Sequence, residues 1–121
     1  MTAHGSRERT LVTEDGVIVC DRCHIAQRPW SRMRGLLGRR CLDESEGILL
    51  RPAASVHTWF MRFPIDVVFL DRDLSVLRVV SGLRPWRAVG RRGSAAVLEL
   101  AAGASDAHGL RVGDRLDWVR A

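Results

Sequence analysis

Apolar residues follow the period of β-strands along most of this chain. Residues 17–20 begin with a β-branched run that comes after the turn signal Glu14-Asp15-Gly16. Residues 67–70 are apolar throughout, which is typical of a strand buried on both faces, and residues 75–80 form its hairpin partner across a turn at 71–73. Further strands are predicted at residues 10–13, 47–50, 55–61, 95–100 and 114–119. Strands about 8–12 residues apart, separated by turn residues, favour an antiparallel sandwich or barrel.

One segment has helical spacing instead. Trp30, Met33, Leu36 and Leu37 fall on one face of a helix, and Gly38 can end it. We therefore predict a mainly β fold, a single-domain antiparallel β sandwich or barrel-like fold with one short α-helix at about 30–38. Residues 9–121 form this domain and residues 1–8 a flexible tail, while the polar residues 103–113 have room for one helical turn.

The composition of the chain indicates which class of protein it belongs to. The chain has 121 residues, of which 46% are hydrophobic and 27% charged, as in an ordinary globular domain. No apolar run approaches the roughly 18 residues that span a bilayer, and the polar start lacks the apolar core of a signal peptide, so we expect a cytoplasmic protein that makes no membrane contact. All 19 basic residues are arginine, against 14 acids, giving a net charge of +5.

The first chemical candidate is Cys20-Asp21-Arg22-Cys23-His24. It matches the C-x-x-C-H pattern of haem attachment, and it could bind zinc with His24 or Cys41. In an extended strand, however, residues three apart point to opposite faces, with Cα atoms roughly 10 Å apart. Chelation would need a tight turn at Asp21-Arg22. We therefore expect two ordinary strand residues in reduced form, and no metal or cofactor.

The second candidate is the segment 55–66. If residues 55–61 form a strand, His57, Trp59 and Met61 share one face, and the imidazole and indole could bind a ligand by stacking and hydrogen bonding. An imidazole titrates near neutrality, so His57 could also carry a proton, with Asp66 to orient it. The structural alternative is that Asp66 pairs with Arg62 or Arg34 and that His57 is half-buried.

Two further features concern charge. Glu99 lies within the apolar strand, where an inward face would require a partner such as Arg34 or Arg62 and an outward face would leave it solvated. The loop 84–93 holds four arginines and Trp86, residue types that bind phosphate and stack on bases, although a solvated turn has the same composition.

Several segments together resemble the family called domain of unknown function 192. They are residues 34–39 (RGLLGR), 47–50 (GILL), 55–71 (SVHTWFMRFPIDVVFLD), 97–100 (VLEL), 102–103, 109–110 and 113–114. The resemblance implies a mainly β domain with one short helix, and it supplies no reaction. The positions that it marks for a shared cleft or core are Arg34, His57, Trp59, Met61, Arg62, Asp66 and Glu99, whereas residues 20–24 lie outside its motifs.

Three functions follow from these features. The preferred hypothesis is a binding module for an unidentified small molecule or peptide, with His57, Trp59 and Met61 in a cleft and Arg62 or Arg34 fixing a negative group. The second is an enzyme in which His57 acts as general acid or base with Asp66. The third, and least favoured, is nucleic-acid binding through residues 84–92, which predicts affinity that falls steeply with salt. The oligomeric state is left open.

Overall fold

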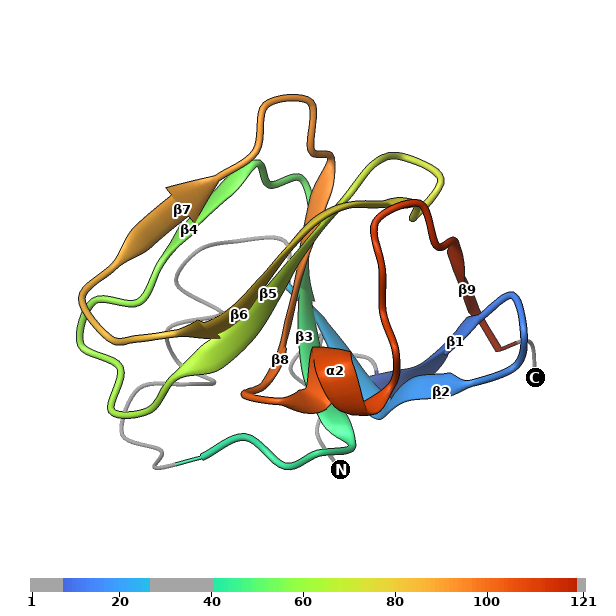
Figure 1. Cartoon of the computed structure of the whole chain (residues 1–121), viewed down its shortest axis with the longest axis horizontal. Coiled ribbons are helices and arrows are strands. Elements are labelled where there is room, and N and C mark those ends of the chain that lie inside the picture. The colour runs from blue at the N-terminus through green and yellow to red at the C-terminus, as the bar shows by residue number, and fades with distance from the viewer. Residues whose placement is uncertain (1–7, 27–40, 120–121) are drawn as a thin grey trace.

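The computed structural model describes residues 8–26 and 41–119 (Figure 1). Within them the chain forms nine strands and one short helix. The predicted helix at about 30–38, and with it Arg34, lies outside the described residues. The strands are β1 (Glu8–Thr13), β2 (Ile18–Ala26), β3 (Glu46–Leu50), β4 (Ser55–His57), β5 (Ile65–Leu70), β6 (Val76–Leu83), β7 (Ala88–Gly90), β8 (Ala96–Ala101) and β9 (Leu116–Trp118), and the helix is α2 (Ala104–Ala107).

Seven of these strands form one sheet in the order β6-β5-β8-β3-β2-β1-β9, and β4 and β7 form a separate two-stranded ribbon. This confirms the mainly β prediction. All neighbours are antiparallel except β2 and β3, which run parallel. Parallel neighbours need a connection of a dozen or more residues, and residues 27–45 provide one.

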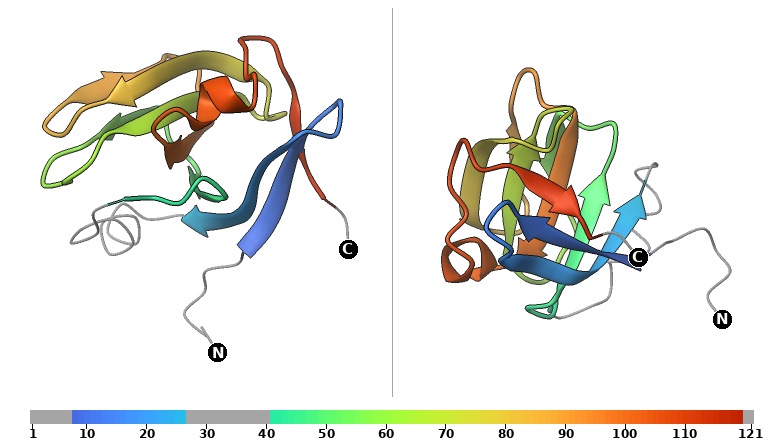
Figure 2. Two further views of the ribbon diagram at one scale, coloured as in Figure 1. Left: turned by 60° about the horizontal axis from the view of Figure 1, so that its bottom comes forward. Right: turned by 90° about the vertical axis from the view of Figure 1, so that its right-hand side faces the viewer.

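The large sheet curls into a half-barrel, as the two views in Figure 2 show. Its edge strands β6 and β9 meet at one end, where an isolated bridge joins Ser75 to Arg115. Two further backbone hydrogen bonds support this contact: the amide of Val76 donates to the carbonyl of Asp114 (2.7 Å), and that of Leu116 donates to the carbonyl of Leu74 (2.9 Å). The barrel-like form of the prediction is therefore the one observed.

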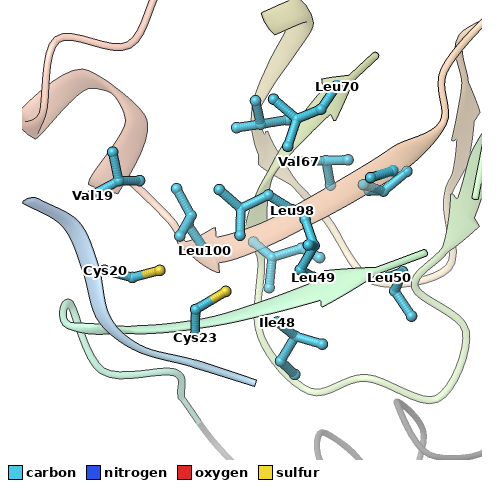
Figure 3. Packing of buried hydrophobic residues seen from close by; sticks show 14 of the residues in the cluster. Val19, Cys20, Cys23, Ile48, Leu49, Leu50, Val67, Leu70, Leu98 and Leu100 are labelled. Carbon is cyan, nitrogen blue, oxygen red and sulfur yellow. The ribbon is translucent and has the colours of Figure 1, made fainter. Parts of the chain in front are cut away.

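The core lies on the central strands. Every residue of β3, β5 and β8 is buried, which confirms that residues 67–70 are covered on both faces. Strands covered on both sides read as apolar runs and lack the polar alternation of a one-sided sheet. Figure 3 shows Leu49, Leu98 and Leu100 packed between these strands.

Two predicted turns connect neighbouring strands. Gly16 has φ +85° between β1 and β2, a conformation that favours glycine. Between β5 and β6, the carboxylate of Asp71 accepts hydrogen bonds from the amides of Asp73 and Ser75, both at 2.9 Å. Such a side-chain acceptor stabilises a tight turn, so this hairpin has the predicted form.

The helical turn expected within residues 103–113 is α2. It follows Gly103, which has φ +92°, and packs against β5, β6 and β8. It is a single turn, and in the described parts of the chain no helix has the length and apolar character to cross a bilayer.

Candidate functional site

The strand predicted at residues 55–61 is wrong in its length. β4 ends at His57, and residues 59–60 form a turn in which the amide of Met61 donates to the carbonyl of Thr58 (3.2 Å). The side chains at 57, 59 and 61 therefore do not share the face of a strand. Trp59 is 49% exposed, whereas Met61 is buried.

The reason is a strand within the basic loop. β7 pairs with β4 over three residues, with Val56 opposite Val89 and His57 opposite Ala88. A three-residue strand between arginines and glycines has no visible hydrophobic period, so the sequence pattern did not predict it. The pairing brings two candidate segments, 55–66 and 84–93, side by side.

Thr58 forms hydrogen bonds that join the loop after β4 to the loop before β7. Its side chain is buried, and its hydroxyl donates to the carbonyl of Arg84 (2.5 Å) and accepts from the amide of Arg87 (3.0 Å). Its backbone amide donates to the carbonyl of Arg87 (2.8 Å), and its carbonyl accepts from the amide of Trp86 (3.1 Å). One residue thus sets the relative position of both loops.

The tip of each loop is a bulky aromatic residue with a left-handed backbone. Phe60 has φ 68° and Trp86 has φ 64°. Their rings meet edge to face with centroids 4.8 Å apart, yet the residues are 61% and 57% exposed. A side chain with a Cβ rarely adopts this conformation, which costs on the order of 1–3 kcal/mol and is concentrated at functional sites.

A second ring pair lies beside the first. The imidazole of His57 stacks on the indole of Trp59, with centroids 4.7 Å apart and an interplanar angle of 30°. Nδ1 of His57 is shielded from solvent and has no hydrogen-bond partner among the described residues. The structure thus brings two of the predicted site residues, His57 and Trp59, into contact.

The segments that carry these rings also carry arginines and no acids. The sequence has no Asp or Glu at residues 47–65 or at residues 74–98. We call residues 54–63 and 84–94 the basic lobe; its arginines are exposed, and none lies within ion-pair distance of a carboxylate in the described ranges. These arginines are Arg62, Arg84, Arg87, Arg91 and Arg92.

Asp66 lies elsewhere and has a structural role. Its Oδ1 accepts from the amide of Gly82 (2.8 Å). Its Oδ2 accepts from the amides of Gly103 (3.1 Å) and Ser105 (2.9 Å) and from the hydroxyl of Ser105 (2.6 Å). The buried carboxylate therefore joins β5 to β6 and to the start of α2. It makes no hydrogen bond to His57 and no ion pair with Arg62, so the His57–Asp66 dyad is not formed.

Glu99 is fully buried, so its side chain faces inward. In the β5–β8 register, Glu99 lies opposite Val67, and Asp66 lies opposite Leu100. Successive residues of a strand point to opposite faces, so the two carboxylates are on opposite sides of the sheet. They cannot line one cleft together with His57.

The Cys20–His24 segment departs from its predicted geometry. Both thiols are buried together, because β2 contains a bulge: the amides of Asp21 and Arg22 both donate to the carbonyl of Ser45 (2.9 and 3.0 Å). The extra residue brings Cys23 back to the side of Cys20, and Figure 3 shows both side chains pointing to the same side of β2. The expectation of opposite faces is therefore wrong.

The environment of these thiols is apolar. The hydrogen bond with the Cys20 side chain, together with burial, raises the pKa of the Cys23 thiol far above its ordinary range. Gly47 provides the space, since a Cβ there would lie 3.0 Å from Sγ of Cys20. Within residues 8–26 and 41–119, no three His, Cys, Asp or Glu side chains gather as a metal site would require.

A cavity of about 480 Å³ lies away from the basic lobe and was not anticipated from the sequence. Its walls carry both signs of charge and leave little net attraction for an ion. They are formed by Glu14, Arg51, Arg72, Asp73, Leu74, Arg115, Leu116, Asp117 and Trp118.

Two crystal structures have a fold similar to that of this chain. A crystal structure of a protein of unknown function from Novosphingobium aromaticivorans superposes with a TM-score of 0.78 over 98% of this chain and 90% of that one, at 23% identity. One from Sinorhizobium meliloti, provisionally described as a transcription regulator, has a TM-score of 0.77 and 23% identity over 98% of this chain and 97% of that one. At this identity the likeness concerns the fold.

Relatives found by sequence share a higher identity with this chain than these two structures do. A UPF0127 protein of Thermococcus sibiricus is 32% identical over 108 residues, which cover 85% of this chain and 70% of the relative. One from Pyrococcus furiosus is 43% identical over 68 residues, 55% of this chain and 58% of the relative. The sequence model of the family described as "Uncharacterized ACR", domain of unknown function 192, matches residues 10–118. The chain therefore belongs to the domain of unknown function 192 family.

Proposed function

We propose that this protein is a binding module whose ligand docks on the basic lobe, against Trp59, Phe60 and Trp86. The observation that carries the proposal is the pair of exposed aromatic tips, Phe60 and Trp86. Both are held in a left-handed backbone and in mutual contact. The proposal keeps the binding hypothesis and moves its site from one strand face to the junction of two loops.

This arrangement does not serve the stability of the fold. Exposed rings leave apolar area in water, at about 25 cal/mol for each Å² that burial would remove, and each left-handed residue adds strain. The hydrogen bonds of Thr58 hold both loops in place against these costs. A rigid, exposed aromatic pair is the kind of surface that gains free energy when a partner covers it.

The chemistry of the lobe specifies the kind of ligand. Rings stack on planar groups, and the guanidinium groups of Arg84 and Arg87 attract carboxylates or phosphates. Nδ1 of His57 has no hydrogen-bond partner among the described residues, and a ligand or a bound water can provide one. A molecule with a planar ring and a negative charge fits all three features.

A ligand screen tests this proposal. Small compounds with an aromatic ring and a carboxylate or phosphate are screened by thermal shift against the wild-type protein and the Trp86→Ala, Phe60→Ala and Val112→Ala variants. Val112 is 67% exposed and lies outside the lobe, so its variant controls for the loss of an exposed apolar side chain. We expect the Trp86 and Phe60 variants to lose the shift and the Val112 variant to keep it. Ligands that shift all four proteins equally would contradict the proposed site.

The enzyme hypothesis is not supported by this arrangement. Both oxygens of Asp66 are engaged by Gly82, Gly103 and Ser105, so His57 lacks the carboxylate that was to orient it.

A further inference from the structure

We infer that the ligand of the basic lobe is a single-stranded nucleic acid. This inference rests on the binding function proposed above and names its ligand class. Two independent properties of the lobe carry it: the separation of charge along the chain and the geometry of the exposed rings.

Charge is distributed unevenly over this protein. The chain has 14 acids, but none falls within residues 47–65 or 74–98, the two stretches that supply the basic lobe. Arg62, Arg84 and Arg87 lie near the rings, and Arg91 and Arg92 follow β7 at the other end of the ribbon. All five are exposed, and none forms an ion pair with a carboxylate of the described residues. A positive surface of this extent suits a partner that carries several negative charges in a row, as a phosphate backbone does.

The rings supply the second property. One face of the Trp59 indole is covered by the His57 imidazole, which leaves the outer face for another planar group. Trp86 and Phe60 meet edge to face, so they offer rings at a different angle beside the first. Two neighbouring ring surfaces flanked by arginines match the way in which successive bases stack in single-strand binding proteins.

The choice of a single strand over a duplex follows from access. Bases in a duplex are stacked on one another, so their faces are closed to a protein ring, whereas an unpaired strand exposes them. The β4–β7 ribbon lies at one side of the molecule in Figure 1 and pairs with no strand of the curled sheet, and its loop tips Phe60 and Trp86 are exposed.

Fluorescence anisotropy with labelled oligonucleotides of about 15 nucleotides tests the inference, since such lengths span the site size of small single-strand binding domains. Mixed-sequence single-stranded RNA and DNA are compared with a duplex of the same sequence, with heparin and with phosphatidylserine vesicles, over a series of salt concentrations. The proteins are the wild type and the Trp86→Ala, Arg84→Ala and Arg111→Ala variants. Arg111 is an exposed arginine outside the lobe and serves as the matched control.

The expected result separates stacking from charge. Trp86→Ala weakens single-strand binding by about tenfold and leaves the salt dependence unchanged. Arg84→Ala reduces the slope of log K against log salt by about 0.7, the value for one phosphate contact to a single strand. Arg111→Ala binds as the wild type does, and the duplex binds more weakly than the single strand.

Three results would overturn the inference. They are equal binding of heparin, duplex and single strand with no effect of Trp86→Ala; preferential binding to the vesicles; and no binding to any oligonucleotide at low salt. The proposed binding function is judged separately by the small-ligand screen. If planar anions bind through Trp86 but oligonucleotides do not, the site is retained and the nucleic acid is rejected.

Discussion

Asp66 illustrates what a single residue contributes to this fold. Its sequence neighbours suggested an arginine partner, but four donors from Gly82, Gly103 and Ser105 surround the carboxylate. Backbone amides leave no mark in the sequence, so the pattern of charges could not show them. These donors satisfy both oxygens of the carboxylate inside the protein.

Replacing this carboxylate by an amide should therefore destabilise the protein. In Asp66→Asn the side-chain NH₂ replaces an oxygen that accepts hydrogen bonds, so one donor is brought against another. We expect the free energy of unfolding to fall by about 3 kcal/mol. Urea unfolding followed by circular dichroism measures the loss. Asp106→Asn, at an exposed position of α2, is the control and should change stability by less than about 0.5 kcal/mol. Equal effects of the two variants would mean that the bonds to Asp66 contribute little.

A second prediction at this scale concerns pH. The pKa of Cys23 is raised in the folded protein by its hydrogen bond with Cys20 and by burial. Above the ordinary thiol value of about 8.5, the unfolded chain releases a proton that the folded chain keeps. Stability is then full below about pH 8.5 and falls as pH rises, by up to about 1.4 kcal/mol per pH unit.

The chain is well suited to this measurement, because it contains no lysine and no tyrosine, and thiols are the side chains that titrate between about pH 8 and 11. Unfolding free energies of the wild type and of Cys23→Ala are compared across that range. The variant should show a flatter profile, whereas Cys41→Ser, which removes an exposed thiol, should keep the wild-type slope. A Cys23→Ala profile as steep as that of the wild type would refute the assignment.

At the scale of elements, the β4–β7 ribbon is the part of the fold that the periodicity of apolar residues predicted least well. Apolar residues from 55 to 61 suggested one long strand, but pairing stops after three residues. Beyond His57, the hydroxyl and backbone of Thr58 form the bonds that a longer ladder would have formed. The short ribbon and its two loops together make the site, which no single segment of sequence contains.

Thr58→Val tests this role of the hydroxyl with little change of shape. The substitution leaves the amide of Arg87 and the carbonyl of Arg84 without their side-chain partner, and we expect a loss of about 2 kcal/mol in unfolding free energy. Urea denaturation again gives the value. Thr13→Val removes an exposed acceptor of the Val17 amide that water can replace, so it should cost less than about 1 kcal/mol. A similar cost for both variants would show that the Thr58 hydroxyl does not hold the two loops together.

For the molecule as a whole, the important feature is that the curled sheet closes at one end only. β6 and β9 meet through the Ser75–Arg115 bridge and the bonds of Val76 and Leu116. Elsewhere the two edges are separate, which makes a half-barrel. Charge shows a similar asymmetry, since the acids lie outside the two stretches that form the basic lobe.

Hydrogen exchange can test the closure. The amides of Val76 and Leu116 should exchange slowly, at rates set by opening of the barrel end, because each is bonded across the two edges. The amide of Val112, an exposed residue that precedes β9, should exchange much faster. Comparable rates for all three amides would show that the edges are not held together in solution.

The sequence by itself determined the class of fold, the hairpin of β5 and β6 and the burial of residues 67–70 on both faces. These features depend on local periodicity and turn chemistry, which neighbouring residues specify. The tertiary structure decided the parallel β2–β3 pair, the common side of Cys20 and Cys23, the isolation of Asp66 from His57, and the meeting of residues 55–66 with residues 84–93. Each depends on a bulge, a register or a backbone donor from a distant part of the chain, and these are set only when the whole sheet assembles.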